Sequence, residues 1–154
     1  MRKTYQTRAV QEKVPSEEMA AARGEITPDM HNFGPAVGWG GLTKEGAIYL
    51  FIQDEPNAPQ TLTLKDVPKA DNAFWSITVY DSDGFPQGEH FNLNSTFATE
   101  NNDGETVVHF GGSPEQENYL EIYDGWTATF RIYSPQPAYF DGSWEVPKPK
   151  PAAN

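Results

Sequence analysis

The sequence contains no cysteine among its 154 residues. Disulfides, thiolate nucleophiles, CxxC redox motifs and cysteine-containing zinc sites are therefore excluded. A chain of this length can bury roughly 68–70% of its unfolded surface, so one domain can fold without a covalent or metal staple. No apolar run approaches the roughly 18 residues of a membrane span.

The N-terminus lacks the apolar segment of a signal peptide. Arg2, Lys3 and Arg8 are followed by mixed polar sequence instead of an apolar stretch. We therefore expect a cytoplasmic protein, or a periplasmic one if a leader has been removed.

Basic residues are scarce in the body of the chain. Residues 24–145 hold four basic and nineteen acidic side chains, and the whole chain has a formal net charge of −11. Such an acidic surface repels phosphate backbones and anionic lipid headgroups. We expect neither nucleic acid nor a membrane as a partner.

The motifs of common catalytic sites are also missing. None of the seven serines lies in a G-x-S-x-G elbow, and the chain has no P-loop or dinucleotide fingerprint. The histidines at 31, 90 and 109 lack the spacing of a metal site, and residues 81–84 lack the closing glutamate of a calcium loop. We expect no metal site and no cofactor, and we predict a hairpin turn at 81–84.

The composition divides the chain into three zones. Residues 1–24 form a polar arm, in which Ser16 as N-cap and Gly24 as stop predict one short helix. Residues 25–146 are predicted to form a β-sandwich domain. Residues 147–154 alternate proline and lysine, so we expect an extended, solvated tail without an apolar anchor.

The body contains short segments in which apolar and polar residues alternate with period two, which is typical of strands. The clearest segments are 61–65, 75–80, 106–110 and 126–133. Residues 47–52 are continuously apolar, as expected of a strand buried on both faces. Four Asp-Gly pairs, at 83, 103, 124 and 141, mark turns. The pattern predicts an all-β fold, an antiparallel and jelly-roll-like β-sandwich with one short N-terminal helix.

The aromatic residues and the single arginine of the body give further expectations. Trp75 and Trp126 lie on apolar strand faces and should belong to the core. Trp39 and Trp144 then remain as exposed aromatic platforms on which a sugar ring could stack. Arg131 shares its strand face with Tyr133. Its guanidinium either pairs with a carboxylate from another segment or stays solvated with its stem on Tyr133.

A set of motifs in this order and spacing resembles a known family, the domain of unknown function 1214, over about residues 33–147. The motifs occupy residues 38–42, 47–49, 74–85, 103–112, 131–135 and 141–144. The resemblance implies a β-sandwich, jelly-roll-like fold and a bacterial origin. It also implies a partner half, because this domain usually forms the C-terminal half of larger proteins, some of which are labelled carboxylesterase. Members often have an arginine in the segment where this chain has Ser95.

The family offers no established catalytic residues, so the candidates for ligand binding are Trp39 and the polar residues nearest to its motifs. These are Asn92, Asn94, His109, Asn118 and Arg131. The missing nucleophile signature favours a binding or assembly module over the alternative, a hydrolase acting on an ester or glycan. We expect a homodimer or a protein partner, with the interface near Trp39, and a small molecule or carbohydrate as a further candidate ligand.

Overall fold

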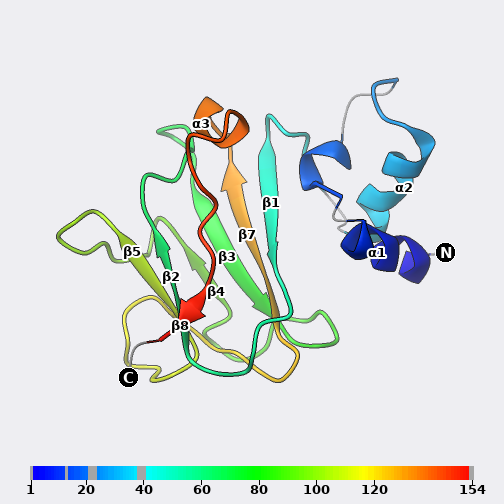
Figure 1. The fold of residues 1–154 in the computed structure, drawn as a ribbon. Helices are drawn as coiled ribbons and strands as arrows, with labels where there is room; N and C mark the ends of the chain where they lie inside the picture. The colour runs from blue at the N-terminus through cyan, green and yellow to red at the C-terminus, as the bar shows by residue number, and fades with distance from the viewer. Residues whose placement is uncertain (1, 13, 21–23, 38–40, 153–154) are drawn as a thin grey trace.

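The computed structural model describes residues 2–12, 14–20, 24–37 and 41–152, and within them the strands form two sheets packed face to face (Figure 1). This arrangement confirms the predicted β-sandwich, and the jelly-roll label stays a prediction. Sheet A has the order β1-β7-β3-β4 and is antiparallel throughout. Sheet B has the order β6-β5-β2-β8, in which only β5 and β6 run parallel.

The strands of sheet A are β1 (Ala47–Ile52), β3 (Trp75–Tyr80), β4 (Asn92–Asn94) and β7 (Thr127–Tyr133). Those of sheet B are β2 (Gln60–Leu64), β5 (Thr106–Phe110), β6 (Tyr119–Leu120) and β8 (Lys150–Pro151). The helical segments are α1 (Arg2–Gln11), the 3-10 helix η1 (Ser16–Glu18), α2 (Pro28–Val37) and α3 (Pro137–Phe140). Glycines 84, 104, 125 and 142 all have positive φ, as the Asp-Gly turns predict.

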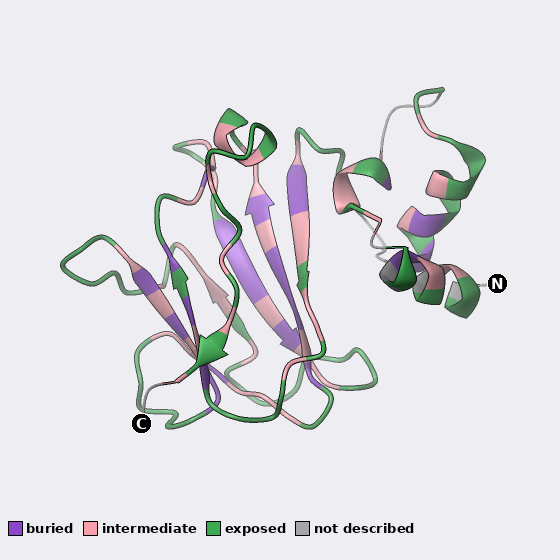
Figure 2. Ribbon diagram, viewed as in Figure 1, coloured by how far each residue is buried: buried purple, intermediate pink, exposed green. Residues whose placement is uncertain are grey.

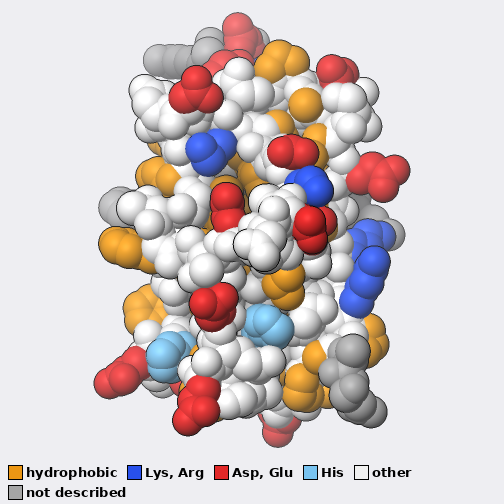
Figure 3. All heavy atoms as spheres, turned by 90° about the vertical axis from the view of Figure 1, so that its left-hand side faces the viewer, with side chains coloured by type: hydrophobic (Ala, Val, Ile, Leu, Met, Phe, Trp, Pro, Cys, Tyr) orange, Lys and Arg blue, Asp and Glu red, His pale blue; other side chains and the backbone are white. Residues whose placement is uncertain are grey.

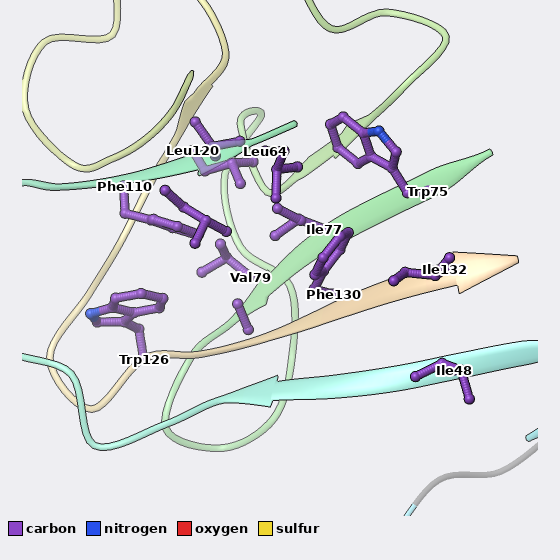
Figure 4. Close-up of a cluster of buried hydrophobic side chains, with 13 residues drawn as sticks. Ile48, Leu64, Trp75, Ile77, Val79, Phe110, Leu120, Trp126, Phe130 and Ile132 are labelled. Carbon is purple, nitrogen blue, oxygen red and sulfur yellow. The ribbon is translucent and has the colours of Figure 1, made fainter. Parts of the chain in front are cut away.

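The core lies between the two sheets and is built by the inward-facing residues of the alternating strands (Figures 2 and 4). The Trp126 ring stacks on Phe110 with 5.0 Å between ring centroids, and its indole N–H donates to Pro56 O at 3.2 Å. Trp75 packs edge-on against Phe130. Both tryptophans predicted to be core are therefore confirmed. Trp144 is half-buried against this core, and its indole N–H donates to Lys65 O, so it is not a free platform.

The N-terminal region differs from the expected single helix. A 3-10 turn stands at the start of the predicted helix, while α1 and α2 were not predicted, and residues 21–23 lie outside the described residues. The signal for α2 was present, because Thr27 Oγ1 accepts the Met30 N–H as a cap and Pro28 begins the helix. Gly34 and Pro35 within the helix obscured it.

The N-terminal helices form a small unit beside the edge of sheet A, with their own apolar contacts among Ala9, Met19 and Phe33 (Figure 1). Gly34 permits this packing, since a Cβ there would stand 2.7 Å from Met19 O. The helical unit therefore includes α2, which the sequence placed in the sandwich zone.

The prediction that both faces of strand β1 are buried is wrong, because Phe51 on its outer face is 43% exposed. Strand β1 is also an edge strand of sheet A, with β7 as its neighbour in the order of the strands. Ser16 Oγ accepts the Tyr49 N–H at 3.0 Å, which satisfies one backbone donor on the open side of the strand. Continuous apolar sequence here reflects an aromatic outer face on an edge strand.

The C-terminal tail is extended as predicted, but it is anchored. Lys150 pairs with Thr61 in β2, and the Ala152 N–H donates to Pro59 O at 3.0 Å. In an antiparallel ladder, alternate residues direct their backbone groups at the neighbouring strand. Pro149 and Pro151 therefore turn their backbone toward solvent, and proline offers no N–H there. Strand β8 ends sheet B, and because of its prolines it has no backbone N–H to donate outward at these positions.

Replacing Trp126 with Ala should lower the free energy of unfolding by about 3–5 kcal/mol, because it removes a buried aromatic ring and leaves a cavity. Urea denaturation measures the change. Phe85, which is 64% exposed, provides the control. Phe85→Ala should stay within about 0.5 kcal/mol of wild type. A loss of stability at Trp126 no larger than at Phe85 would refute the core assignment.

The double substitution Pro149→Thr and Pro151→Thr should promote self-association, because it restores two backbone donors on the outer edge of β8. Sedimentation velocity over a concentration series, at about 0.15 M salt to screen charge repulsion, measures the mean mass. Pro114→Thr, in an exposed loop outside the strands, is the matched control and should remain as wild type. Equal masses for all three proteins would contradict a guarding role for the prolines.

Candidate functional site

Two rows of outward-facing side chains cross sheet A, because residues that lie opposite each other in neighbouring antiparallel strands share a face. One row runs through Tyr49, Arg131, Ser76 and Asn94. The next runs through Phe51, Thr129, Thr78 and Asn92. Three of the predicted site residues, Asn92, Asn94 and Arg131, therefore lie on one sheet face.

Arg131 is the centre of a hydrogen-bond network on this face. Its Nη2 donates to the Tyr80 hydroxyl at 2.7 Å, and its Nη1 donates to Thr78 Oγ1 at 3.0 Å and to Thr129 O at 3.4 Å. Asn92 Nδ2 donates to the same Thr78 Oγ1 at 2.9 Å. The network holds the half-buried guanidinium in place and links it to Asn92.

Arg131 has no carboxylate partner in the described part of the chain. The ion pairs among the described residues join Arg8 to Glu12 and Asp29, and Lys65 to Glu105. The expected pairing with a carboxylate is therefore absent there. The solvated alternative holds only for part of the group, because the Thr78 and Tyr80 hydroxyls and Thr129 O accept bonds from both Nη atoms, while the Nε–H has no acceptor among the described residues. The positive charge is oriented but not neutralised.

Aromatic rings flank the arginine. Phe74 stacks on Tyr133 with 4.4 Å between ring centroids, one row away from Arg131. Phe74 is 42% exposed, and Leu42, whose N–H donates to the Tyr49 hydroxyl, is 47% exposed. We call this surface the arginine face; it consists of Tyr49, Phe51, Phe74, Thr78, Tyr80, Asn92, Thr129, Arg131 and Tyr133. It combines one cation with rings and neutral polar groups.

His109 lies elsewhere, on sheet B, beside an open groove of about 540 Å³. Gln116 Nε2 stands 3.2 Å from His109 Nδ1, and Gly111, Gly112 and Ser113 line the same groove. Among the described residues that line it, none is acidic and none is Trp, Tyr or Phe. The groove therefore offers amide, imidazole and hydroxyl groups but none of the large aromatic rings on which sugars stack.

The acidic residues on the side of the molecule shown in Figure 3 are spread over the surface instead of gathered into one site. Within the described residues no group of three His, Cys, Asp or Glu side chains could hold a metal ion. The predicted turn at 81–84 closes on itself, since Asp81 Oδ1 accepts the Asp83 and Phe85 N–H groups. These hydrogen bonds lower the pKa of Asp81, the bond from Phe85 contributing most.

Asn118 serves the fold instead of a ligand. Its side chain donates to Thr99 O and Val107 O and accepts the Thr99 N–H, with all three distances between 2.8 and 3.1 Å. Its φ of 54° lies in the left-handed region, which asparagine tolerates. Asn94 has a smaller local role, because its Oδ1 accepts the Thr96 N–H in a turn. Trp39 lies outside the described residues.

A second cluster of titratable groups, which the sequence did not predict, lies at residues 119–123. Burial and the neighbouring Glu121 carboxylate raise the pKa of Tyr123 to about 12. Its hydroxyl oxygen is buried without a hydrogen-bond partner among the described residues. The pKa of Tyr139 is likewise raised to about 12, mainly by burial and to a smaller extent by the Glu17 carboxylate. Both phenols stay protonated near neutral pH and are poor candidates for a general base.

The fold and site together define a β-sandwich with an arginine-centred sheet face, and comparison with known proteins adds its family. A family model described as "Protein of unknown function (DUF1214)" matches residues 44–137. The chain belongs to this family, which confirms the resemblance seen in its motifs.

Comparison with solved structures finds the same fold at low identity in a longer protein. The VPA0106 protein from Vibrio parahaemolyticus is 16% identical with a TM-score of 0.71, over 98% of this chain and 42% of that chain. An uncharacterized protein from Burkholderia cenocepacia is 16% identical with a TM-score of 0.49, over 68% of this chain and 28% of that chain. This chain therefore spans less than half the length of either protein. No curated protein matches it. No helix among the described residues is long and apolar enough to cross a membrane.

Asn118→Ala should lower the free energy of unfolding by about 2–3 kcal/mol, because it removes three hydrogen bonds and places alanine at positive φ. Asn94→Ala removes one turn bond and should cost only about 0.5–1 kcal/mol. Urea denaturation of both variants measures the difference. Equal losses would mean that Asn118 has no greater structural role than Asn94.

Proposed function

We propose that this chain is a protein-binding module and that the arginine face of sheet A is its contact surface. Tyrosine, phenylalanine and arginine are the residues that interface cores favour, while lysine and acidic residues are depleted there. The arginine face has this composition, with Tyr49, Phe51 and Tyr133 around Arg131 and no acidic side chain in the two central rows.

The observation that carries the proposal is the state of Arg131. The chain has 22 acidic and 11 basic residues, so carboxylates are plentiful. Nevertheless, the half-buried guanidinium has only hydroxyl and carbonyl acceptors among the described residues. A partly desolvated charge without a counter-charge is costly alone, and a partner that supplies the counter-charge recovers that cost on binding.

The longer relatives support a protein as the partner. The Vibrio protein matches nearly this whole chain with less than half of its own length. By analogy with the additional length of that protein, the proposed partner is a separate protein or domain. Leu42, whose N–H donates to the Tyr49 hydroxyl, follows Trp39 closely in the sequence, which agrees with the expectation of an interface near Trp39.

The other candidate functions have less support. A face-to-face homodimer would bring two copies of a face that lacks acids in its central rows, so Arg131 would gain no counter-charge. For a hydrolase, Ser113 and His109 both line the groove, but His109 Nδ1 contacts Gln116, and Ser113 Oγ accepts the Glu115 N–H at 3.4 Å. The groove remains a candidate site for a small neutral ligand.

The proposal predicts that Phe51→Ser weakens partner binding at least tenfold. Wild type and variant, each immobilised as the full chain, are exposed to extract of the cells that make the protein, and the retained protein is then purified for direct titration. Phe51 is suitable because it is 43% exposed on the arginine face. Phe85→Ser, at an exposed position in the turn after β3 and outside the arginine face, is the matched control and should bind as wild type.

Sedimentation equilibrium of the purified chain tests the homodimer. A concentration-dependent dimer that Phe51→Ser dissociates would replace the partner by a second copy. Retention of the same proteins by wild type, Phe51→Ser and Phe85→Ser would refute the proposed contact surface. Unchanged thermal unfolding of each variant shows that the fold is intact.

A further inference from the structure

The hydrogen-bond inventory of Arg131 leaves part of its guanidinium free for a ligand. A guanidinium carries five N–H groups in a planar fork. The Arg131 guanidinium donates three hydrogen bonds to described residues, two from Nη1 and one from Nη2. The Nε–H and one Nη2–H therefore have no acceptor among the described residues. Nε and Nη2 lie on one side of the planar group, and a carboxylate accepts two parallel bonds from this side when the unused Nη2–H is the one next to Nε–H.

The three existing bonds also orient the guanidinium. Tyr80 and Thr78 lie on β3 and Thr129 lies on β7. Acceptors on two paired strands therefore fix the orientation of the guanidinium. An arginine held in this way loses less conformational entropy on binding than a free surface arginine. By contrast, Arg8 has its Nε–H bound to Glu12 at 2.8 Å and a further contact with Asp29 at 3.4 Å.

The surroundings favour a single carboxylate over a more highly charged anion. The chain carries a net charge of −11, and Arg131 is one of only four basic residues between positions 24 and 145. One positive charge cannot balance a phosphate dianion against this field. A carboxylate carries one negative charge and fits the planar fork, while the exposed rings of Phe51 and Phe74 offer apolar contact around it.

We propose that Arg131 is the recognition residue of the arginine face and binds a carboxylate side chain of the partner, an aspartate or glutamate flanked by apolar residues. This inference rests on the proposed function, because it names the chemistry of the partner at the same surface. Thr78 and Tyr80 are positioning residues, since they accept hydrogen bonds from Nη1 and Nη2 and leave the Nε–H without an acceptor among the described residues. Asn92 acts through Thr78.

The test uses a small probe and requires no knowledge of the partner. The 15N-labelled full chain is titrated with N-acetyl-glutamate N-methylamide while the side-chain Nε–H signals of the arginines are followed by NMR. The Arg131 signal should shift in a saturable manner, and the uncharged N-acetyl-glutamine N-methylamide should produce no such shift. Arg8 is the internal control and should not respond, because its Nε–H is already bound to Glu12.

A variant at a positioning residue separates orientation from charge. Tyr80→Phe keeps Arg131 and its charge but removes the acceptor of the Nη2 bond. It should raise the dissociation constant for the glutamate probe several-fold, and Arg131→Gln should abolish binding. An Arg131 signal that does not move, or that moves equally with the glutamine probe, would overturn the inference. Binding to Tyr80→Phe at full affinity would overturn the positioning role.

A failure of carboxylate recognition by Arg131 can be distinguished from a failure of the proposed function. If Phe51→Ser releases the partner while Arg131 ignores the glutamate probe, the face is an interface without carboxylate recognition. If Arg131 binds the probe while partner retention is independent of Phe51, the carboxylate site exists but the proposed contact surface is wrong. In the first case Arg131→Gln retains the partner as well as wild type does.

Discussion

The register of β7 is the constraint on which the rest of this structure depends. Phe130 and Ile132 face the core, while Arg131 and Tyr133 between and after them face outward. Both neighbours, β1 and β3, pair with β7 along its length. A slip of one residue would exchange the two faces, burying a guanidinium and exposing the core side chains. The same alternation that builds the core therefore also presents the proposed recognition residue.

Burial of the inner face makes this register robust. The two sheets enclose a contiguous cluster that includes Trp126, Phe110 and Phe130 (Figure 4). Because the cluster draws on strands of both sheets, each strand's orientation is enforced by contacts from the opposite side. The outer face of sheet A is then free to vary in composition without loss of the fold, which is the condition for a surface that recognises a partner.

The edges of the two sheets are treated differently. On sheet B, Pro149 and Pro151 withhold backbone donors from the outer side of β8. On sheet A, a side chain, Ser16, satisfies the Tyr49 N–H of β1, and the helical unit lies alongside (Figure 1). The β8 edge is blocked by proline chemistry, and the β1 edge is capped by the N-terminal region. Recognition through a sheet face, by side chains, is compatible with protection of these two edges against strand addition.

Local signals in the sequence determined much of the fold. Alternation with period two identified the longer strands, and the Asp-Gly pairs identified turns in which glycine adopts positive φ. Both signals are local, so neither needs knowledge of the partner strand. The sequence also placed Trp75 and Trp126 in the core, because their neighbours in the strand are polar. The short strands β4, β6 and β8 escaped this reasoning, since two or three residues cannot show a period.

Tertiary structure alone decided which strand is an edge and which polar groups meet. The apolar run of β1 is typical of a strand buried on both faces, yet β1 ends sheet A, and Phe51 on its outer face is exposed. Sequence proximity to family motifs selected Asn118 and Arg131 alike, but Asn118 closes loops through backbone bonds while Arg131 stands on an open face. Arg131 donates to side-chain oxygens of Thr78 and Tyr80, which lie about fifty positions away in the sequence. Contacts at such separation depend on strand pairing, which composition and periodicity do not encode because they describe each strand without its neighbour.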